Sequence, residues 1–143
     1  MNHWMMIGNP AAASSAAGDT WKATIEPLKH AGLDIDSVAT QSKGHGIQFA
    51  FEAAGKGYRC FLSAGGDGTL HEVMTGLLRY CDATSVSMEE FTVGVLPYGT
   101  GNDWLRSTGI PGNLEAAMKA VVEGNTSKED VVRVKVDGRF TAW

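Results

Sequence analysis

Residues 58–80 read YRCFLSAGGDGTLHEVMTGLLRY and place a glycine-rich turn between two apolar segments. The first segment, Tyr58–Ser63, is almost continuously apolar, which is typical of a parallel strand buried on both faces. The second, Leu70–Tyr80, carries an apolar stripe at helical spacing, formed by Leu70, Val73, Met74, Leu77 and Leu78. The stretch therefore predicts a strand, a tight turn and a helix in direct succession.

The same alternation extends to both sides of this unit. Upstream it predicts strands over His3–Ile7 and Ile35–Ala39, and helices over Asp19–His30 and Gly46–Ala54. Gly32 is expected to end the first helix, and Pro27 to kink or offset it. Downstream it predicts a strand over Phe91–Leu96 and a helix over Leu114–Val122. Such repeated units predict an α/β fold with an open, doubly wound, mostly parallel sheet in a Rossmann-like three-layer α/β/α arrangement.

The last residues break this pattern. Val132, Val134 and Val136 alternate with charged residues, and Asp137-Gly138 is typical of a two-residue hairpin turn. We therefore predict an α/β domain over residues 1–130 and a β-hairpin over residues 131–143. The hairpin is interpreted as the opening of a second β domain that the chain does not contain. Its unpaired edge predicts self-association into a homo-oligomer.

Composition narrows the classes of function. The chain has 143 residues and a net charge of −4, unlike the basic face of a nucleic-acid-binding protein, so no nucleic-acid partner is expected. Cys60 and Cys81 lie in no metal-ligand spacing, and we assign no metal ligand and no disulfide. No apolar run reaches the roughly 18 residues that a membrane span needs. We expect a cytoplasmic protein whose contact with a membrane is limited to the membrane surface.

The turn Gly65-Gly66-Asp67-Gly68-Thr69 is the first candidate site. Ligands of open parallel sheets bind at the carboxyl ends of strands, where this turn lies. Glycines let backbone N–H groups approach phosphate oxygens, and the following helix adds a favourable dipole. Thr69 can donate its hydroxyl to the same phosphates, and Asp67 can hold Mg²⁺ through water or orient a neighbouring loop. The alternative is a plain tight turn, and the spacing matches neither the P-loop nor GxGxxG.

Two further loops follow predicted strands. Residues 96–103 read LPYGTGND and supply a second glycine–threonine turn, in which Asn102 or Asp103 can instead be a plain N-cap. The turn Gly8-Asn9-Pro10 follows the first strand, where Asn9 either offers its amide to a phosphate or serves a generic turn. Three loops at the ends of three buried strands predict a single phosphate-binding cleft.

Taken in order, these motifs resemble the diacylglycerol kinase catalytic domain, a family that includes bacterial lipid kinases and the sphingosine and ceramide kinases. The resemblance rests on IGNP at 7–10, GHG at 44–46, GGDGTLHEV at 65–73, LPYGTGNDW at 96–104 and GIP at 109–111. The glycine-rich turn alone is shared with NAD kinases, whereas the last two motifs favour the lipid branch. Two positions depart from the family. Ala11–Ala13 stand where it has a small residue and then Ser-Gly, and His71 stands where many bacterial members have Asn.

The resemblance implies a nucleotide site and a role for each of its residues. It places the ATP phosphates against residues 65–71, with Thr40 and Thr100 as further contacts, and assigns Asn9, Glu72, Asn102 and Asp103 to shaping and bracing the cleft. The implied site comprises Asn9, Thr40, Gly65, Gly66, Asp67, Gly68, Thr69, Leu70, His71, Glu72, Gly99, Thr100, Gly101, Asn102 and Asp103. Asp67 would support catalysis, and the general base is expected in a second domain beyond Trp143.

The implied reaction transfers the γ-phosphoryl group of ATP, with Mg²⁺, to the hydroxyl of a lipid such as diacylglycerol. Because this chemistry depends on positioning and on charge neutralisation, we expect the 143-residue chain to bind nucleotide but to transfer phosphate poorly or not at all. Three alternatives remain open. They are an NAD kinase-like or other non-lipid kinase, a nucleotide-binding module that never catalyses, and an ordinary dinucleotide-binding domain, which would lack its GxGxxG signature.

Overall fold

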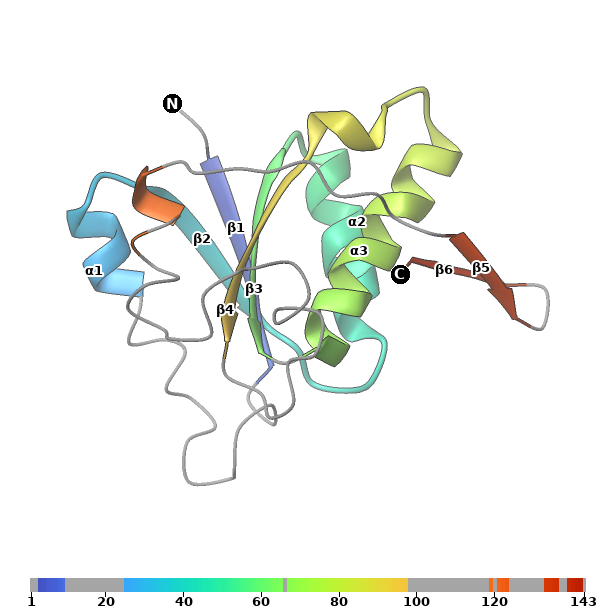
Figure 1. The fold of residues 1–143 in the computed structure, drawn as a ribbon, viewed down its shortest axis with the longest axis horizontal. Helices are drawn as coiled ribbons and strands as arrows, with labels where there is room; N and C mark the ends of the chain where they lie inside the picture. The colour runs from blue at the N-terminus through green and yellow to red at the C-terminus, as the bar shows by residue number, and fades with distance from the viewer. Residues whose placement is uncertain are drawn as a thin grey trace.

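Four parallel strands form the central sheet of the protein (Figure 1). The computed structural model describes residues 3–9, 25–65, 67–97, 119, 121–123, 133–136 and 139–142. The strands are β1 (His3–Gly8), β2 (Asp34–Ala39), β3 (Cys60–Gly65) and β4 (Thr92–Pro97), and their order in the sheet is β2-β1-β3-β4. All three pairings are parallel, which confirms the predicted α/β class.

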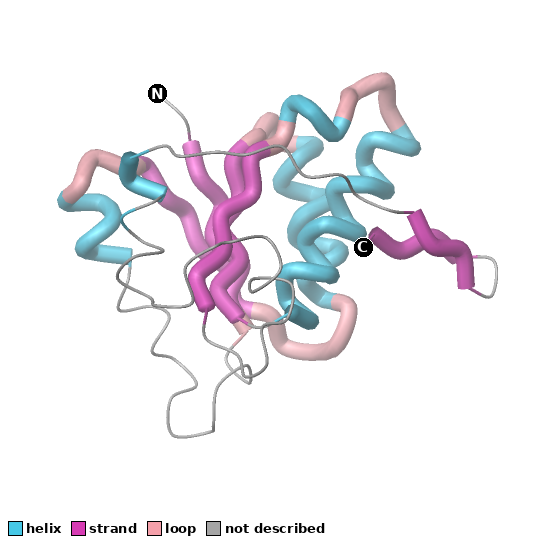
Figure 2. Tube along the Cα trace, in the orientation of Figure 1, coloured by secondary structure: helices cyan, strands magenta, loops and turns pink. Residues whose placement is uncertain are grey.

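Helices cover both faces of this sheet, and alternate strand residues supply the two cores. On one face Met6, Leu62 and Leu96 pack with Leu28 of α1 (Ile25–His30). On the other face Ile7 and Phe61 pack with the helices α2 (His45–Gly55) and α3 (Asp67–Ala83). Figure 2 shows α1 and the α2–α3 pair on opposite sides of the strands.

The strand order explains this division of the helices. The chain crosses from β1 to β2 in one direction and from β2 to β3 in the other. Because parallel crossovers are right-handed, the reversal puts α1 and α2 on opposite faces. The connection from β3 to β4 continues in the second direction, so α3 joins α2.

Helices α2 and α3 touch almost backbone to backbone at Gly76. A Cβ atom at Gly76 would lie 2.4 Å from the Ile47 carbonyl oxygen and 2.8 Å from the Ala50 Cβ. Only glycine permits this separation, because any side chain would push the two helices apart. The beginnings of α2 and α3 are thereby held close together at the edge of the sheet where the candidate loops lie.

Glycines in the left-handed region end α1 and α2. Gly32 and Gly57 both have a φ of 103°. The following N–H groups turn back onto the helices, from Leu33 to the Leu28 carbonyl and from Tyr58 to the Ala53 carbonyl, each at 3.1 Å. The predicted stop at Gly32 is confirmed. Strand β3 begins at Cys60 rather than at the predicted Tyr58, because the Tyr58 N–H belongs to this helix stop.

Two predicted helices lie partly outside the described residues. Helix α1 is described from Ile25 onward, so the predicted start at Asp19 lies outside the described residues. Pro27 lies inside the described helix, as its third residue. Of the helix predicted over residues 114–122, residues 119 and 121–122 are described, and they are helical. Within the described part of the chain, no helix is long and apolar enough to cross a bilayer.

The predicted hairpin is present. Strand β5 (Arg133–Val136) pairs antiparallel with β6 (Arg139–Ala142), and Val136 stands opposite Arg139. The turn predicted at Asp137-Gly138 lies outside the described residues. Strand β6 runs beside α3 (Figure 1).

A polar cluster joins the amino-terminal ends of β1 and β2. His3 contacts Asp34 through Nδ1 at 2.9 Å and Asp36 through Nε2 at 2.6 Å. The Tyr58 hydroxyl also donates to Asp36, and its ring packs edge-on against His3. This cluster lies at the opposite end of the sheet from the candidate site.

Candidate functional site

The carboxyl-terminal ends of β1, β2 and β3 meet at one edge of the sheet. The chain leaves β1 to one side for β2 and returns on the other side for β3, so β1 and β3 flank the point where the strand order reverses. Ligands of open α/β sheets bind at such a point. The Asn9 N–H donates to the Ala64 carbonyl at 3.1 Å, and the Thr40 N–H donates to the Gly8 carbonyl at 2.8 Å. These two hydrogen bonds join the carboxyl-terminal ends of β1, β2 and β3 side by side.

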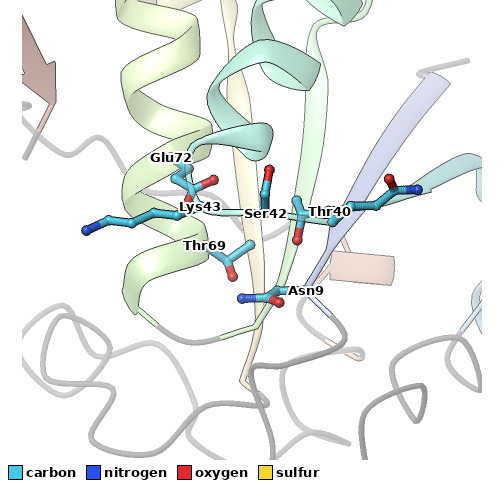
Figure 3. A pocket seen from close by; sticks show the side chains of 7 residues that line it. Asn9, Thr40, Ser42, Lys43, Thr69 and Glu72 are labelled. Atoms are coloured by element: carbon cyan, nitrogen blue, oxygen red, sulfur yellow. The ribbon is translucent and has the colours of Figure 1, made fainter.

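A pocket of about 370 Å³ opens at this edge (Figure 3). Its volume lies within the range of small-molecule sites, roughly 300–1,000 Å³. The lining residues come from the end of β1, the segment after β2 and the first turns of α3, and they are Asn9, Thr40, Gln41, Ser42, Lys43, Thr69 and Glu72. The structure thus brings together four of the predicted site residues, Asn9, Thr40, Thr69 and Glu72.

The glycine-rich turn is shorter than the sequence suggested. Gly65 is the last residue of β3 and Asp67 is the first of α3, so the helix begins three residues before the predicted Leu70. Asp67, Gly68 and Thr69 form the first turn of the helix rather than a loop. The first N–H groups of a helix have no intrahelical acceptor, and they carry the positive end of the helix dipole.

Thr69 presents an unsatisfied hydroxyl to this site. The residue is only 4% exposed, and its Oγ1 is buried with no hydrogen-bond partner among the described residues. In Figure 3 the side chains of Thr69 and Asn9 lie next to each other among the residues that line the pocket. A buried hydroxyl without a partner costs free energy, which a ligand acceptor would relieve.

Gly68 has no structural reason to be glycine within the described chain. A Cβ atom at this position would meet nothing within 4 Å, and its φ is not in the left-handed region. Glycine in a helix costs about 0.5–1 kcal/mol relative to alanine. Within the described chain, the space beside the Gly68 backbone is therefore open.

Glu72 connects the two helices that border the pocket. Its Oε1 accepts a hydrogen bond from the Gly46 N–H at 2.8 Å. The N-cap of α2, Gly44, has no side chain to do this, so a carboxylate from α3 caps the start of α2.

The segment after β2 was not among the predicted site residues, apart from Thr40. Gln41, Ser42 and Lys43 line the pocket, and Lys43 supplies an exposed cation. A polar run directly after a predicted strand was the available signal, but polar residues follow most strands. In Figure 3 the Lys43 side chain extends away from Asn9.

The remaining predicted residues are not part of the described pocket lining. Leu70 is 1% exposed and packs with Val95, so its side chain belongs to the core. Gly65, Gly68 and His71 are described but do not line the pocket, and Asp67 is described by its place as the first residue of α3. Outside the described residues lie Gly66, Gly99, Thr100, Gly101, Asn102 and Asp103.

Both cysteine thiols have a raised pKa. Burial raises the pKa of the Cys60 thiol, which lies in the core beside Trp4. Burial, with a smaller contribution from Asp82, also raises the pKa of Cys81. Since the thiolate is the reactive form, a raised pKa makes both thiols less reactive at neutral pH. The described residues contain no group of three or more His, Cys, Asp or Glu able to hold a metal ion.

Comparison with known proteins agrees with this geometry. The family described as "Diacylglycerol kinase catalytic domain" matches residues 3–134. A protein named "Probable lipid kinase YegS" from Escherichia fergusonii is 33% identical over 126 residues, covering 88% of this chain and 40% of the relative. Its counterpart from Escherichia coli O127:H6 is 36% identical over 107 residues, covering 75% and 34%.

Solved structures with the same fold come from the same class of protein. A crystal structure of a diacylglycerol kinase from Bacillus anthracis strain Sterne has a TM-score of 0.70 and 26% identity, covering 87% of this chain and 44% of that one. A second B. anthracis structure has a TM-score of 0.72 and 26% identity, covering 97% and 47%. The chain spans about 40% of the length of the first curated relative. On the extent of the match, its sequence identity and its fold, the chain belongs to the diacylglycerol kinase catalytic domain family.

Proposed function

We propose that the pocket binds the phosphates of Mg-ATP and that this chain forms the nucleotide-binding part of an ATP-dependent lipid kinase. The observation that carries the proposal is the buried Thr69 hydroxyl, which has no partner among the described residues and lies in the first turn of α3. The glycine at position 68 leaves the adjacent backbone open to a phosphate oxygen. Lys43 adds positive charge at the rim of the pocket.

Each of these groups has a chemical task in phosphoryl transfer. The reaction requires the phosphates to be held in line and their charge to be neutralised. Backbone N–H groups at the start of α3 and the Thr69 hydroxyl are preorganised donors, which cost no rearrangement when the transition state forms. The Lys43 ammonium group is flexible and exposed, so it can follow the terminal phosphates. Asn9 and Thr40 border the phosphates from the β1 and β2 side.

Mg²⁺ fits this site as an ion carried by the nucleotide. Magnesium keeps several waters and takes one or two carboxylates together with substrate phosphates, and when bound it neutralises phosphate charge. Asp67, the first residue of α3, is the carboxylate that we assign to it, either directly or through water. The same assignment gives Asp67 its supporting role in catalysis.

The proposed acceptor of the phosphoryl group is inferred from the names of the relatives. YegS is named a lipid kinase, and the relatives extend well beyond the matched region. We assign the acceptor, a lipid hydroxyl such as that of diacylglycerol, and the general base to that further region. The lipid acceptor would bring the protein from the cytoplasm to a membrane surface.

Light scattering at several concentrations tests self-association through the β5–β6 hairpin.

Calorimetric titration of Mg-ATP against the purified chain tests the proposal. We expect saturable binding that weakens at least tenfold in Gly68→Ala, since the new methyl occupies the space proposed for a phosphate. The helix itself should gain stability, because alanine is the better helix former. Gly55→Ala is the matched control, because its Cβ meets only the Tyr80 ring, at 3.8 Å, far from the pocket.

The outcomes separate the alternatives. Equal ATP affinity in the native chain and Gly68→Ala would refute the phosphate site. Binding of NAD as well as ATP would instead favour an NAD kinase-like protein. If ATP binds but a longer form carrying the relatives' further region transfers phosphate to no lipid, a non-catalytic nucleotide module is the better description.

A further inference from the structure

Glu72 lines a pocket proposed for phosphates although it carries a negative charge. A carboxylate facing a phosphate would repel it unless the carboxylate is engaged elsewhere. The Oε1 atom of Glu72 is engaged, because it accepts the Gly46 N–H at 2.8 Å. It also lies at the start of α2, whose dipole favours a negative charge. The carboxylate is thus directed toward a protein partner.

The bond from Glu72 leads directly to the opposite wall of the pocket. Gly46 is the second residue of α2, and the first, His45, is tied to the pocket segment in two ways. The Gln41 N–H donates to His45 Nδ1 at 3.1 Å, and the His45 N–H donates to the Ser42 carbonyl at 3.1 Å. Stacking of the His45 ring on Phe49, with centroids 4.0 Å apart, holds the imidazole in place.

The same helix face carries Thr69 and Glu72. Residues three apart on a helix lie side by side, so α3 presents the Thr69 hydroxyl to the pocket and, one turn later, pins the start of α2. The distance between Thr69 and the segment Gln41–Lys43 therefore depends on the contact between Glu72 and Gly46, in addition to the close packing of the two helices at Gly76. That contact leaves no spare room, since a Cβ on Gly46 would lie 2.8 Å from Glu72 Oε1 and 3.1 Å from its Cβ.

We propose that Glu72 is a positioning residue, which sets the width of the phosphate pocket by holding α2 through the Gly46 N–H and does not itself contact the nucleotide. The proposal deepens the proposed function and rests on it. It predicts that the affinity for Mg-ATP depends on the hydrogen-bond-accepting oxygen of Glu72 and not on its negative charge.

Four variants test this prediction by Mg-ATP titration. Glu72→Gln keeps the side-chain shape and an accepting oxygen, so its affinity should stay within about threefold of native. Glu72→Ala and Gly46→Ala each break the contact and should each weaken binding about tenfold or more. The double variant should bind no more weakly than Glu72→Ala alone, because residues that act through one contact are not additive. The matched control is Glu52→Ala, which removes an exposed α2 carboxylate bonded to Gln48 at 3.0 Å.

A second measurement on the nucleotide-free chain keeps this test separate from the proposed function. The backbone amide signals of Gln41, Ser42 and Lys43 should move in Glu72→Ala and stay near their native positions in Glu72→Gln. A residue that merely stabilised the fold would not move these signals selectively. If the native chain binds no ATP, the proposed function fails, but the amide shifts still decide the positioning role.

Three results would overturn the inference. The first is Glu72→Gln binding as weakly as Glu72→Ala, which would mean that the charge acts on the ligand or its metal. The second is additive losses in the double variant. The third is unmoved amide signals at residues 41–43 in a folded Glu72→Ala chain.

Discussion

Replacing Thr69 by valine separates the stability of the fold from binding at the site. Valine has nearly the same shape as threonine and the same branching at Cβ, so the helix backbone is undisturbed. The change removes one hydroxyl, which is buried and has no hydrogen-bond partner among the described residues. Its loss should make the folded protein more stable but make Mg-ATP binding weaker.

The magnitudes follow from the environment of the hydroxyl. An unsatisfied buried polar group costs about 1–3 kcal/mol, so Thr69→Val should raise the free energy of unfolding by about 1 kcal/mol. A hydrogen bond to a charged group contributes about 1.5–3 kcal/mol, and each 1.4 kcal/mol is a factor of ten in affinity. The same variant should therefore weaken Mg-ATP binding by roughly tenfold to a hundredfold.

Ser63→Ala is the matched control for this experiment. The Ser63 hydroxyl is also buried without a partner among the described residues, but Ser63 does not line the pocket. Urea unfolding should show a stability equal to or above native in both variants, and calorimetry should show weaker ATP binding in Thr69→Val alone. Native ATP affinity in Thr69→Val would refute the role of the hydroxyl. A loss of stability above about 1 kcal/mol would show that the hydroxyl has a partner in the folded protein.

Three further predictions concern packing and pH. Gly76→Ala should lower the free energy of unfolding in urea by about 1–3 kcal/mol through overpacking, because its Cβ would lie 2.4 Å from the Ile47 carbonyl oxygen, whereas Gly55→Ala should not. The hydrogen bond from Tyr58, followed by that from His3, lowers the pKa of Asp36 below its ordinary 3.8. The stabilisation from Asp36 is therefore complete above about pH 3.8 and is lost as the pH falls through the lowered pKa, so Asp36→Asn should flatten the acid limb of a stability–pH curve. The hydrogen bond to Asp36 also raises the pKa of Tyr58 above 10.0, so the alkaline limb should flatten in Tyr58→Phe, and unchanged limbs in both variants would contradict the reasoning.

The predicted elements were largely right because their signals are local. The apolar run before Gly65 and the stripe from Leu70 to Leu78 are visible within a few residues, and the structure confirms a strand and a helix there. Predicted boundaries were less accurate. Strand β3 starts late, since Tyr58 completes the stop of α2, and α3 starts early, since Asp67, Gly68 and Thr69 adopt helical geometry.

The candidate site was predicted in part. The glycine-rich turn marks the carboxyl end of a strand, and Thr69 from this motif lines the pocket, while its phosphate contact stays a prediction. Leu70 was grouped with the same motif, but its apolar side chain packs against Val95 in the core. Gln41, Ser42 and Lys43 were missed, because nothing in the residues near them shows which strand end will stand beside the turn.

The sequence by itself determined the class of the fold, the strand–helix units and the motif that identifies the family, since hydrophobic period and turn chemistry are properties of neighbouring residues. Only the tertiary structure decided the strand order β2-β1-β3-β4, which brings the segment after β2 beside the first turn of α3. Only the tertiary structure joined Glu72 to Gly46, which lie 26 residues apart in the chain. The reason is physical. Strand order and helix contacts follow from the handedness of the crossovers and from the close packing of distant segments, and neither is encoded in any single stretch of residues.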